Sequence, residues 1–201
     1  MAINAFNNVT PGAKLALVNN KLGNPGLKKN QGSSSEIYDY VKIGTPGSTE
    51  VIRFFSSVNT KTFPFTNLTN GNLLQVGEAL AVEYVMFTRM EVSRAGKILG
   101  ITPLLSITEL SVSQFSLLLD NSRIIKTNSL MRSLEAFNTK GGTAKNYTYY
   151  PDTDLTIPPQ ISFTAELQVP LNTDTAPADT DVYYGCHLLG TGAILNLKTN
   201  V

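Results

Sequence analysis

The sequence contains one cysteine, one histidine and no tryptophan. Because Cys186 is alone, the chain cannot form an intrachain disulfide or a metal site built from several cysteines. His187 follows it directly, and adjacent residues of a strand point to opposite faces of a sheet, so a nucleophilic Cys–His dyad is not expected. A metal site with several histidine ligands is also excluded. The composition therefore predicts no catalytic residue, no cofactor and no metal site built from cysteines or histidines.

Charged side chains are scarce as well. They make up 15% of the chain, well below the usual ~25%, and the formal net charge is +1. This balance argues against a protein that binds nucleic acid over its whole surface. Asparagine, threonine, serine and glycine take the place of charged residues, which is typical of a β protein that uses much of its surface for contact.

No targeting or membrane-spanning segment is recognisable. The first residues, MAINAFNNVTPGAKLALVNN, lack a basic region followed by an apolar run and a small-residue cleavage site. The longest apolar stretches, around residues 79–87, are too short to cross a bilayer. We therefore expect a soluble protein that is made in the cytoplasm and has no membrane span.

The first 35 residues differ from the rest of the chain. They contain Lys14, Lys21, Lys28 and Lys29 but no acidic residue, and turn-forming residues recur in the GNPG and QGSSS sequences. Turn formers at this density do not build a hydrophobic core. We interpret residues 1–35 as an extended or partly disordered arm, with the option of one short strand at residues 13–18, and residues 36–201 as the folded domain.

The segment IPPQISFTAELQVP, residues 157–170, alternates between apolar and polar side chains. One face of the predicted strand would carry Ile161, Phe163, Ala165, Leu167 and Val169. Such a pattern buries one face and exposes the other, which is typical of an antiparallel sheet, whereas a parallel strand covered on both faces is apolar throughout. The flanking prolines lack an amide donor and cannot continue a central ladder.

Further short strands are expected between turn signals. The sequence EIYDYVKIG places Ile37, Asp39 and Val41 on one face, and VIRFFSSV follows it. A long strand over residues 78–92 is predicted to direct Leu80, Val82, Tyr84 and Met86 one way and Glu83, Arg89 and Glu91 the other. The sequence VYYGCHLLGTGAILNLK supplies the last one or two strands.

Turn chemistry adds detail to this pattern. Asn70-Gly71 and Asp120-Asn121 each predict a hairpin, and residues 130–137 favour one or two helical turns. Gly190 and Gly192 lack the lysine and hydroxyl of a phosphate-binding loop, so they indicate a bulge or a close backbone approach. About eight strands with almost no helix predict a sandwich or a barrel.

Two surface features leave alternatives open. The DTD sequences at residues 152–154 and 179–181, with Asp174 beside the second, would either bind calcium or, as we favour, form solvated turns. The tyrosines of NYTYYP, which are Tyr147, Tyr149 and Tyr150, would either stack on sugars or bases or, as we favour, belong to an interface.

Four segments of the chain together suggest a family. In order, they are FPFTNLTNGNLLQVGEALAVEYVMF, FSLLLDNSRIIK, IPPQISFTAELQVP and HLLGTGAILNLK. Roughly residues 50–201 resemble the single jelly-roll virion proteins of bacterial viruses, particularly capsid-type proteins, in strand order and texture. This resemblance implies an eight-stranded β-sandwich that assembles in many copies into a shell without catalysis. The arm before residue 36 departs from a bare jelly roll and resembles the N-terminal arms through which capsid subunits are tied to their neighbours.

We therefore expect an all-β protein, an antiparallel two-sheet jelly-roll β-sandwich with an extended N-terminal arm. The leading hypothesis is a non-enzymatic structural virion protein, a capsid subunit that self-assembles into the shell. The alternative is a head-fibre, decoration or receptor- or carbohydrate-binding β-sandwich, with the three tyrosines as its ligand platform.

The expected partners are other copies of the chain and other virion proteins, in a virion whose proteins are made in the host cytoplasm. Contact between the arm and nucleic acid is open but not favoured, because the arm mixes its few lysines with apolar residues. The candidate interface residues are Lys14, Leu15, Leu17, Val18, Tyr147, Tyr149 and Tyr150.

Overall fold

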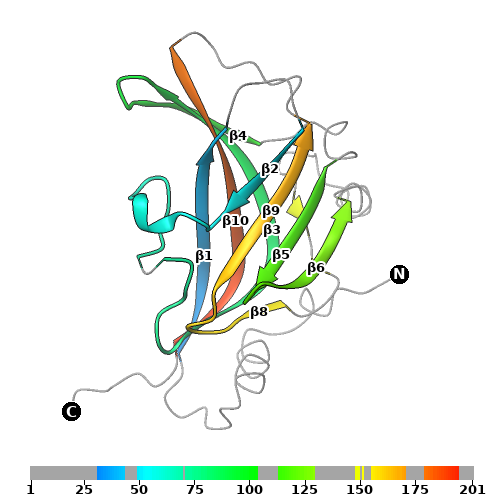
Figure 1. The fold of residues 1–201 in the computed structure, drawn as a ribbon. Helices are drawn as coiled ribbons and strands as arrows, with labels where there is room; N and C mark the ends of the chain where they lie inside the picture. The colour runs from blue at the N-terminus through cyan, green and yellow to red at the C-terminus, as the bar shows by residue number, and fades with distance from the viewer. Residues whose placement is uncertain are drawn as a thin grey trace, which may run out of the picture.

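The chain folds into two antiparallel β-sheets (Figure 1). The computed structural model describes residues 31–43, 49–69, 71–103, 113–129, 148–149, 151, 155–170 and 179–194. Within these residues the only helical element is the short 3-10 helix η3 (Val58–Thr60). The expected all-β, two-sheet architecture is confirmed. The helical turns predicted at residues 130–137 and the strand considered at residues 13–18 lie outside the described residues.

The first sheet is built around three long strands in the order β1-β10-β3, with β4 beside β3. Its strands are β1 (Gln31–Lys42), β3 (Glu78–Ser93), β4 (Ile98–Pro103) and β10 (Thr180–Ile194), and the short strands β7 (Thr148–Tyr149) and β8 (Leu155–Ile157) also pair with β3. The second sheet has the order β2-β9-β5-β6. Its strands are β2 (Thr49–Phe54), β5 (Gln114–Leu119), β6 (Ser122–Ser129) and β9 (Phe163–Pro170).

The pairing of the strands is nested along the chain. β1 pairs with β10, β2 with β9, β3 with β8, and β5 with β6, all antiparallel. The outermost strands in sequence are therefore partners, and each following pair lies inside the previous one. Consecutive strands β1 and β2 belong to different sheets, so the chain crosses between the two layers as it proceeds.

The alternating pattern of β9 sets its buried face as predicted. Phe163, Ala165, Leu167 and Val169 are all buried in the main core between the sheets. The prediction is wrong for Ile161, which is exposed because it precedes the strand and follows a turn in which Gln160 has a positive φ of 56°. Alternation thus continues only as far as the extended backbone of the strand, which begins at Phe163.

The predicted face of β3 is wrong beyond its first third. Leu80 and Val82 are in the core, but Val85 and Phe87 follow them in place of Tyr84 and Met86. The register against β10 shifts between Leu189 and Gly190, so Glu83 has no residue opposite it. A bulge of this kind inserts one residue and reverses the alternation.

Gly190 is the residue that permits this bulge. A Cβ atom at this position would lie 1.9 Å from the carbonyl oxygen of Ala81, a distance that no real side chain tolerates. The expectation of a bulge or a close backbone approach in the GTG sequence is therefore confirmed at Gly190.

The hairpins differ from the prediction in one case. Asp120 and Asn121 join β5 to β6, both with positive φ, as two-residue hairpins of the primed type require. Asn70 lies outside the described residues, and the described residues on either side of it form no strand pair, because no strand lies between η3 and β3 there. The hairpin on the other side of β3, which turns through Gly96 with a φ of 81° into β4, was not predicted.

The first strand begins earlier than the sequence suggested. β1 starts at Gln31 and pairs with β10 along its whole length, so the QGSSS sequence is part of a strand. Its assignment to the arm, with the domain starting at residue 36, is corrected. Residues 1–30 lie outside the described residues.

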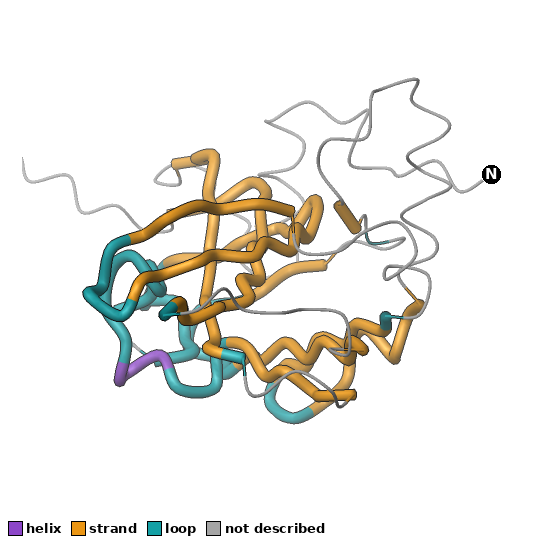
Figure 2. Tube along the Cα trace, turned by 90° about the horizontal axis from the view of Figure 1, so that it is seen from above, coloured by secondary structure: helices purple, strands orange, loops and turns teal. Residues whose placement is uncertain are grey.

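The long connection between β2 and β3 covers the free edge of β1. Tyr40 N–H donates to the Phe65 carbonyl at 2.8 Å, and Tyr38 N–H donates to Asn67 Oδ1 at 2.9 Å. Most of the described loops, including the one that carries η3, lie on one side of the strands (Figure 2). An edge strand is thereby protected from pairing with another chain.

Candidate functional site

The only histidine lies in a polar cluster on the face of the first sheet that points away from the main core. His187 in β10 is opposite Tyr38 in β1 and Met86 in β3. Two residues earlier in β10, Gly185 is opposite Tyr40 of β1 and Thr88 of β3. A Cβ atom at Gly185 would lie 2.5 Å from Tyr40 Cε1 and 2.6 Å from Thr88 Oγ1. Glycine at this position therefore makes room for the tyrosine ring to reach Thr88 across β10.

The cluster is connected by hydrogen bonds through the imidazole. His187 Nδ1 lies 2.6 Å from Glu36 Oε1, and His187 Nε2 lies 2.8 Å from Thr88 Oγ1. The hydroxyls of Thr88 and Tyr40 share a further hydrogen bond of 3.1 Å. Because a carboxylate oxygen accepts, Nδ1 of His187 carries a proton toward Glu36.

Burial lowers the pKa of His187 below its ordinary value, and the hydrogen bond and charge of Glu36 oppose this effect. The imidazole is therefore neutral at neutral pH, and its contact with Glu36 is a hydrogen bond in place of an ion pair. Tyr38 stacks on the ring with a centroid distance of 5.5 Å, and Tyr40 meets it edge-on at 5.5 Å.

The sequence of hydroxyl, imidazole and carboxylate has the connectivity of a nucleophilic triad. Its environment is that of a structural cluster. Thr88 and His187 are each 7% exposed, and the imidazole is covered by the stacked ring of Tyr38 and the edge-on ring of Tyr40. The hydroxyl therefore has no open face for a substrate, and the cluster ties β1, β10 and β3 together.

The cysteine lies on the opposite side of the sheet. Cys186 is fully buried in the main core, whereas His187 belongs to the outer cluster. The expectation that the two side chains point to opposite faces of the sheet is confirmed. Burial, together with the nearby charge of Asp39, raises the pKa of the Cys186 thiol well above its ordinary value, so the thiolate that would be a nucleophile is strongly disfavoured.

The sequence did not predict the buried ion pair between Asp39 of β1 and Lys61 of the β2–β3 connection. Asp39 is completely buried, and Lys61 Nζ lies 2.8 and 2.9 Å from its two carboxylate oxygens. Asp39 Oδ2 also accepts the backbone N–H of Phe55 at 2.7 Å, where the chain has a positive φ of 62°. Burial raises the pKa of Asp39, while Lys61 and the Phe55 N–H lower it less strongly. The pair holds the β2–β3 connection against β1.

All but one of the predicted interface residues lie outside the described residues. Lys14, Leu15, Leu17 and Val18 lie outside the described residues, as do Tyr147 and Tyr150. The backbone of Tyr149 is in β7, opposite Val85 of β3.

The two aspartates of the second DTD sequence form ion pairs with basic side chains of the protein. Asp179 pairs with Arg94 at 2.8 Å, and Asp181 pairs with Lys42 at 2.8 Å. No group of three or more potential metal ligands occurs within the described ranges. Residues 152–154 and Asp174 lie outside these ranges.

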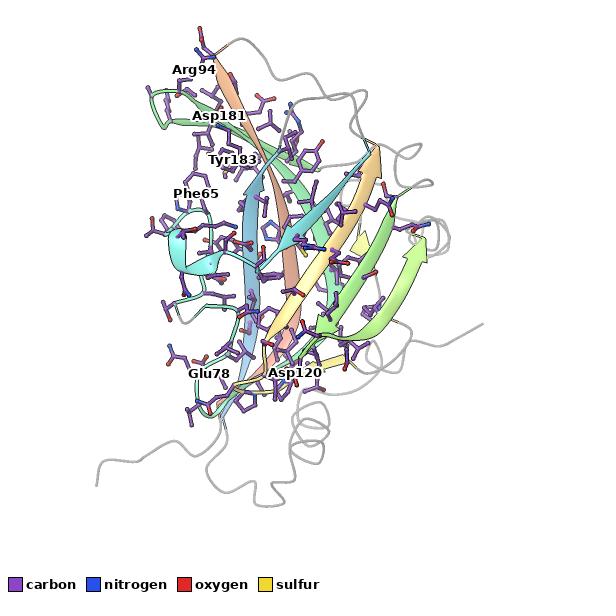
Figure 3. The ribbon with its side chains drawn as sticks, in the orientation of Figure 1. Phe65, Glu78, Arg94, Asp120, Asp181 and Tyr183 are labelled. Atoms are coloured by element: carbon purple, nitrogen blue, oxygen red, sulfur yellow. The ribbon has the colours of Figure 1, made fainter. Side chains whose placement is uncertain are left out.

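Two surface features remain as candidate binding regions. Exposed apolar side chains gather on β4, where Ile98, Leu99 and Ile101 lie on the β3–β4 hairpin that extends from one end of the molecule (Figure 1). At the opposite end, where β1 and β3 begin, a cavity of about 220 Å³ lies between these strands and the β2–β3 connection. Glu78 marks this end in Figure 3, and Arg94 and Asp181 mark the other.

Among the described residues, no helix is long and apolar enough to cross a membrane. Comparison of the chain with protein-family models, with curated proteins and with solved structures gave no match.

Proposed function

We propose that this chain is a structural protein of a viral particle, namely a capsid subunit that self-assembles into the shell of a bacterial virus. The observation that carries the proposal is the nested pairing of eight strands across two sheets, β1 with β10, β2 with β9, β3 with β8, and β5 with β6. We infer that this arrangement is a jelly roll, an architecture of viral capsid proteins.

The same architecture also occurs in lectins and cupins, so it does not select a function alone. A cupin-type metal centre needs several histidines, whereas this chain has one, and that residue is held by Glu36 and Thr88. The hydroxyl of Thr88 and the thiol of Cys186 are both buried. These observations support a non-enzymatic role.

The exposed side chains of the β3–β4 hairpin support self-association. Ile98, Leu99 and Ile101 are exposed on neighbouring positions of one strand, and clustered apolar side chains on a surface mark sites of contact. A repeating shell needs such complementary surfaces on every subunit. The low content of charged residues is consistent with a surface of which much is covered after assembly.

Electron microscopy and light scattering of the purified full-length protein test the proposal. We expect shells, sheets or other closed assemblies of many copies, and the protein should be abundant in purified virus particles. Discrete small oligomers that bind glycans would instead favour a receptor- or carbohydrate-binding β-sandwich of the virion. A protein that stays monomeric at high concentration and is absent from particles would contradict both functions.

A further inference from the structure

The cavity at the end of the sandwich where β1 begins has a lining that is more polar than apolar, with apolar side chains at its floor. Its volume of about 220 Å³ is below the roughly 300–1,000 Å³ of clefts that hold drug-sized ligands. Side chains from β1, β3 and the connection between β2 and β3 form this floor. They are Ile37, Leu68, Leu74, Ala79 and Leu80. The volume therefore suits one or two side chains of a protein segment better than an organic cofactor.

Polar residues, including two carboxylates, line the rest of the cavity. They are Ser35, Glu36, Asn67 and Glu78. Glu36 accepts from His187, and Glu78 Oε2 accepts the backbone N–H of Gln75 at 3.2 Å. Within the described part of the chain, neither glutamate is paired with a lysine or an arginine. An occupant with apolar side chains and a positive charge would match both parts of the lining.

The chain itself contains a segment with these two properties. Residues 1–30 include four lysines and no acidic residue, and the sequence AKLALV at residues 13–18 places Lys14 beside Leu15 and Leu17. Thirteen Cα-to-Cα steps lead from Val18 to Gln31, the first residue of β1. Fully extended, this stretch spans roughly 43–47 Å, which is enough to reach a neighbouring subunit.

We infer that this cavity binds residues 14–18 of the arm of a second copy of the chain. Leu15 or Leu17 fills the apolar floor, and the ammonium group of Lys14, on its flexible stem, reaches Glu78 at the rim. The inference rests on the proposed self-assembly of the chain, and it assigns one specific contact within that assembly.

Disulfide trapping in the full-length protein tests this contact. Ala13→Cys places a thiol beside the binding segment, and Val76→Cys places one beside the rim, at a side chain that is 78% exposed. Cys186 contributes no background because it is completely buried. Under mild oxidation the double variant should form covalent dimers and a ladder of higher oligomers on non-reducing gels.

Two controls separate a specific contact from random collision. Ala13→Cys combined with Ile101→Cys places the second thiol at an exposed site on β4, at the other end of the molecule, and it should lose the ladder. Glu78→Gln, added to the first pair, removes the charge but keeps an acceptor for the Gln75 N–H, and should lower the dimer yield about two- to fivefold. Asp181→Asn should leave the yield unchanged.

The outcomes are distinct. Dimers that depend on Glu78 support the inference. A disulfide formed only within one chain, seen as a faster-migrating monomer without a ladder, overturns the assignment to a second copy. Particles that form normally in the microscope while the Ala13–Val76 pair gives no more dimer than the control overturn the inference but leave the proposed function standing. A protein that neither assembles nor cross-links overturns both.

Discussion

Replacement of Phe163 by alanine is the most direct test of the two-sheet core. Its ring is 1% exposed and lies 5.1 Å from the ring of Phe55, in the middle of the main cluster. Truncation of a buried phenylalanine removes its transfer free energy and leaves a cavity, at a cost of about 3–5 kcal/mol. For a chain of this size each kcal/mol corresponds to about 2–4 °C, so the melting temperature should fall by roughly 6–20 °C.

Thr164→Ala is the matched control, because the two positions are adjacent on β9 but point to opposite faces. Thr164 is opposite Leu118 of β5 and is only half-buried, so its replacement should cost at most about 1 kcal/mol. Thermal unfolding followed by circular dichroism measures both variants. Equal losses at the two positions, or a larger loss at Thr164, would refute the register of β9, because a slip by one residue exchanges the faces.

Three further predictions follow from the polar clusters. Because the pKa of His187 is lowered on folding, the folded state binds fewer protons than the unfolded state. The free energy of unfolding should therefore fall as the pH drops from about 6.5 through the folded-state pKa. Unfolding measured against pH should show this slope in the wild type and lose it in His187→Gln. Gly185→Ala forces a methyl group into the buried tyrosine ring of β1 and should cost about 1–3 kcal/mol in urea unfolding, whereas Gly100→Ala, where nothing lies within 4 Å, should cost less than half as much. Lys61→Met leaves Asp39 buried without its cation and should lower the free energy of unfolding by about 3–5 kcal/mol at neutral pH. The loss should be smaller at low pH, where the carboxyl group of Asp39 is protonated. A loss that does not depend on pH would contradict the buried charge as its cause.

The features that the sequence predicted are those that local rules determine. The buried face of β9 follows from alternation, because each strand residue reverses direction. The turn at Asp120-Asn121 follows from the ability of these residues to adopt positive φ. Both depend only on residues adjacent in the chain.

The features that were missed depend on residues far apart in the chain. Asp39 alternates correctly with Ile37 and Val41, but its partner Lys61 follows 22 positions later, in a connection with no regular pattern. Alternation placed Asp39 on the same face as Ile37 and Val41, and only the covering connection explains how a carboxylate is tolerated there. The Asn70-Gly71 signal failed for a related reason, because the segment before it covers an edge and does not form a strand.

Two glycines of β10 show how the polar cluster could have been recognised from the sequence. In a long strand, a glycine loses entropy and packs no side chain, so it is retained where another group needs its space. Gly190 accommodates the carbonyl of Ala81 and Gly185 accommodates Tyr40 and Thr88. Gly185 lies two residues before His187, so both residues belong to the same face of β10. A glycine at this position therefore indicates that side chains from the two neighbouring strands meet over β10 on that face. The sequence cannot say which side chains these are, because Glu36, Thr88 and His187 are joined only by the register of β1-β10-β3. The pairing of β10 with β3 along their whole length depends on the bulge at Gly190. Without this bulge, every residue of β3 before Tyr84 would face the other side of the sheet.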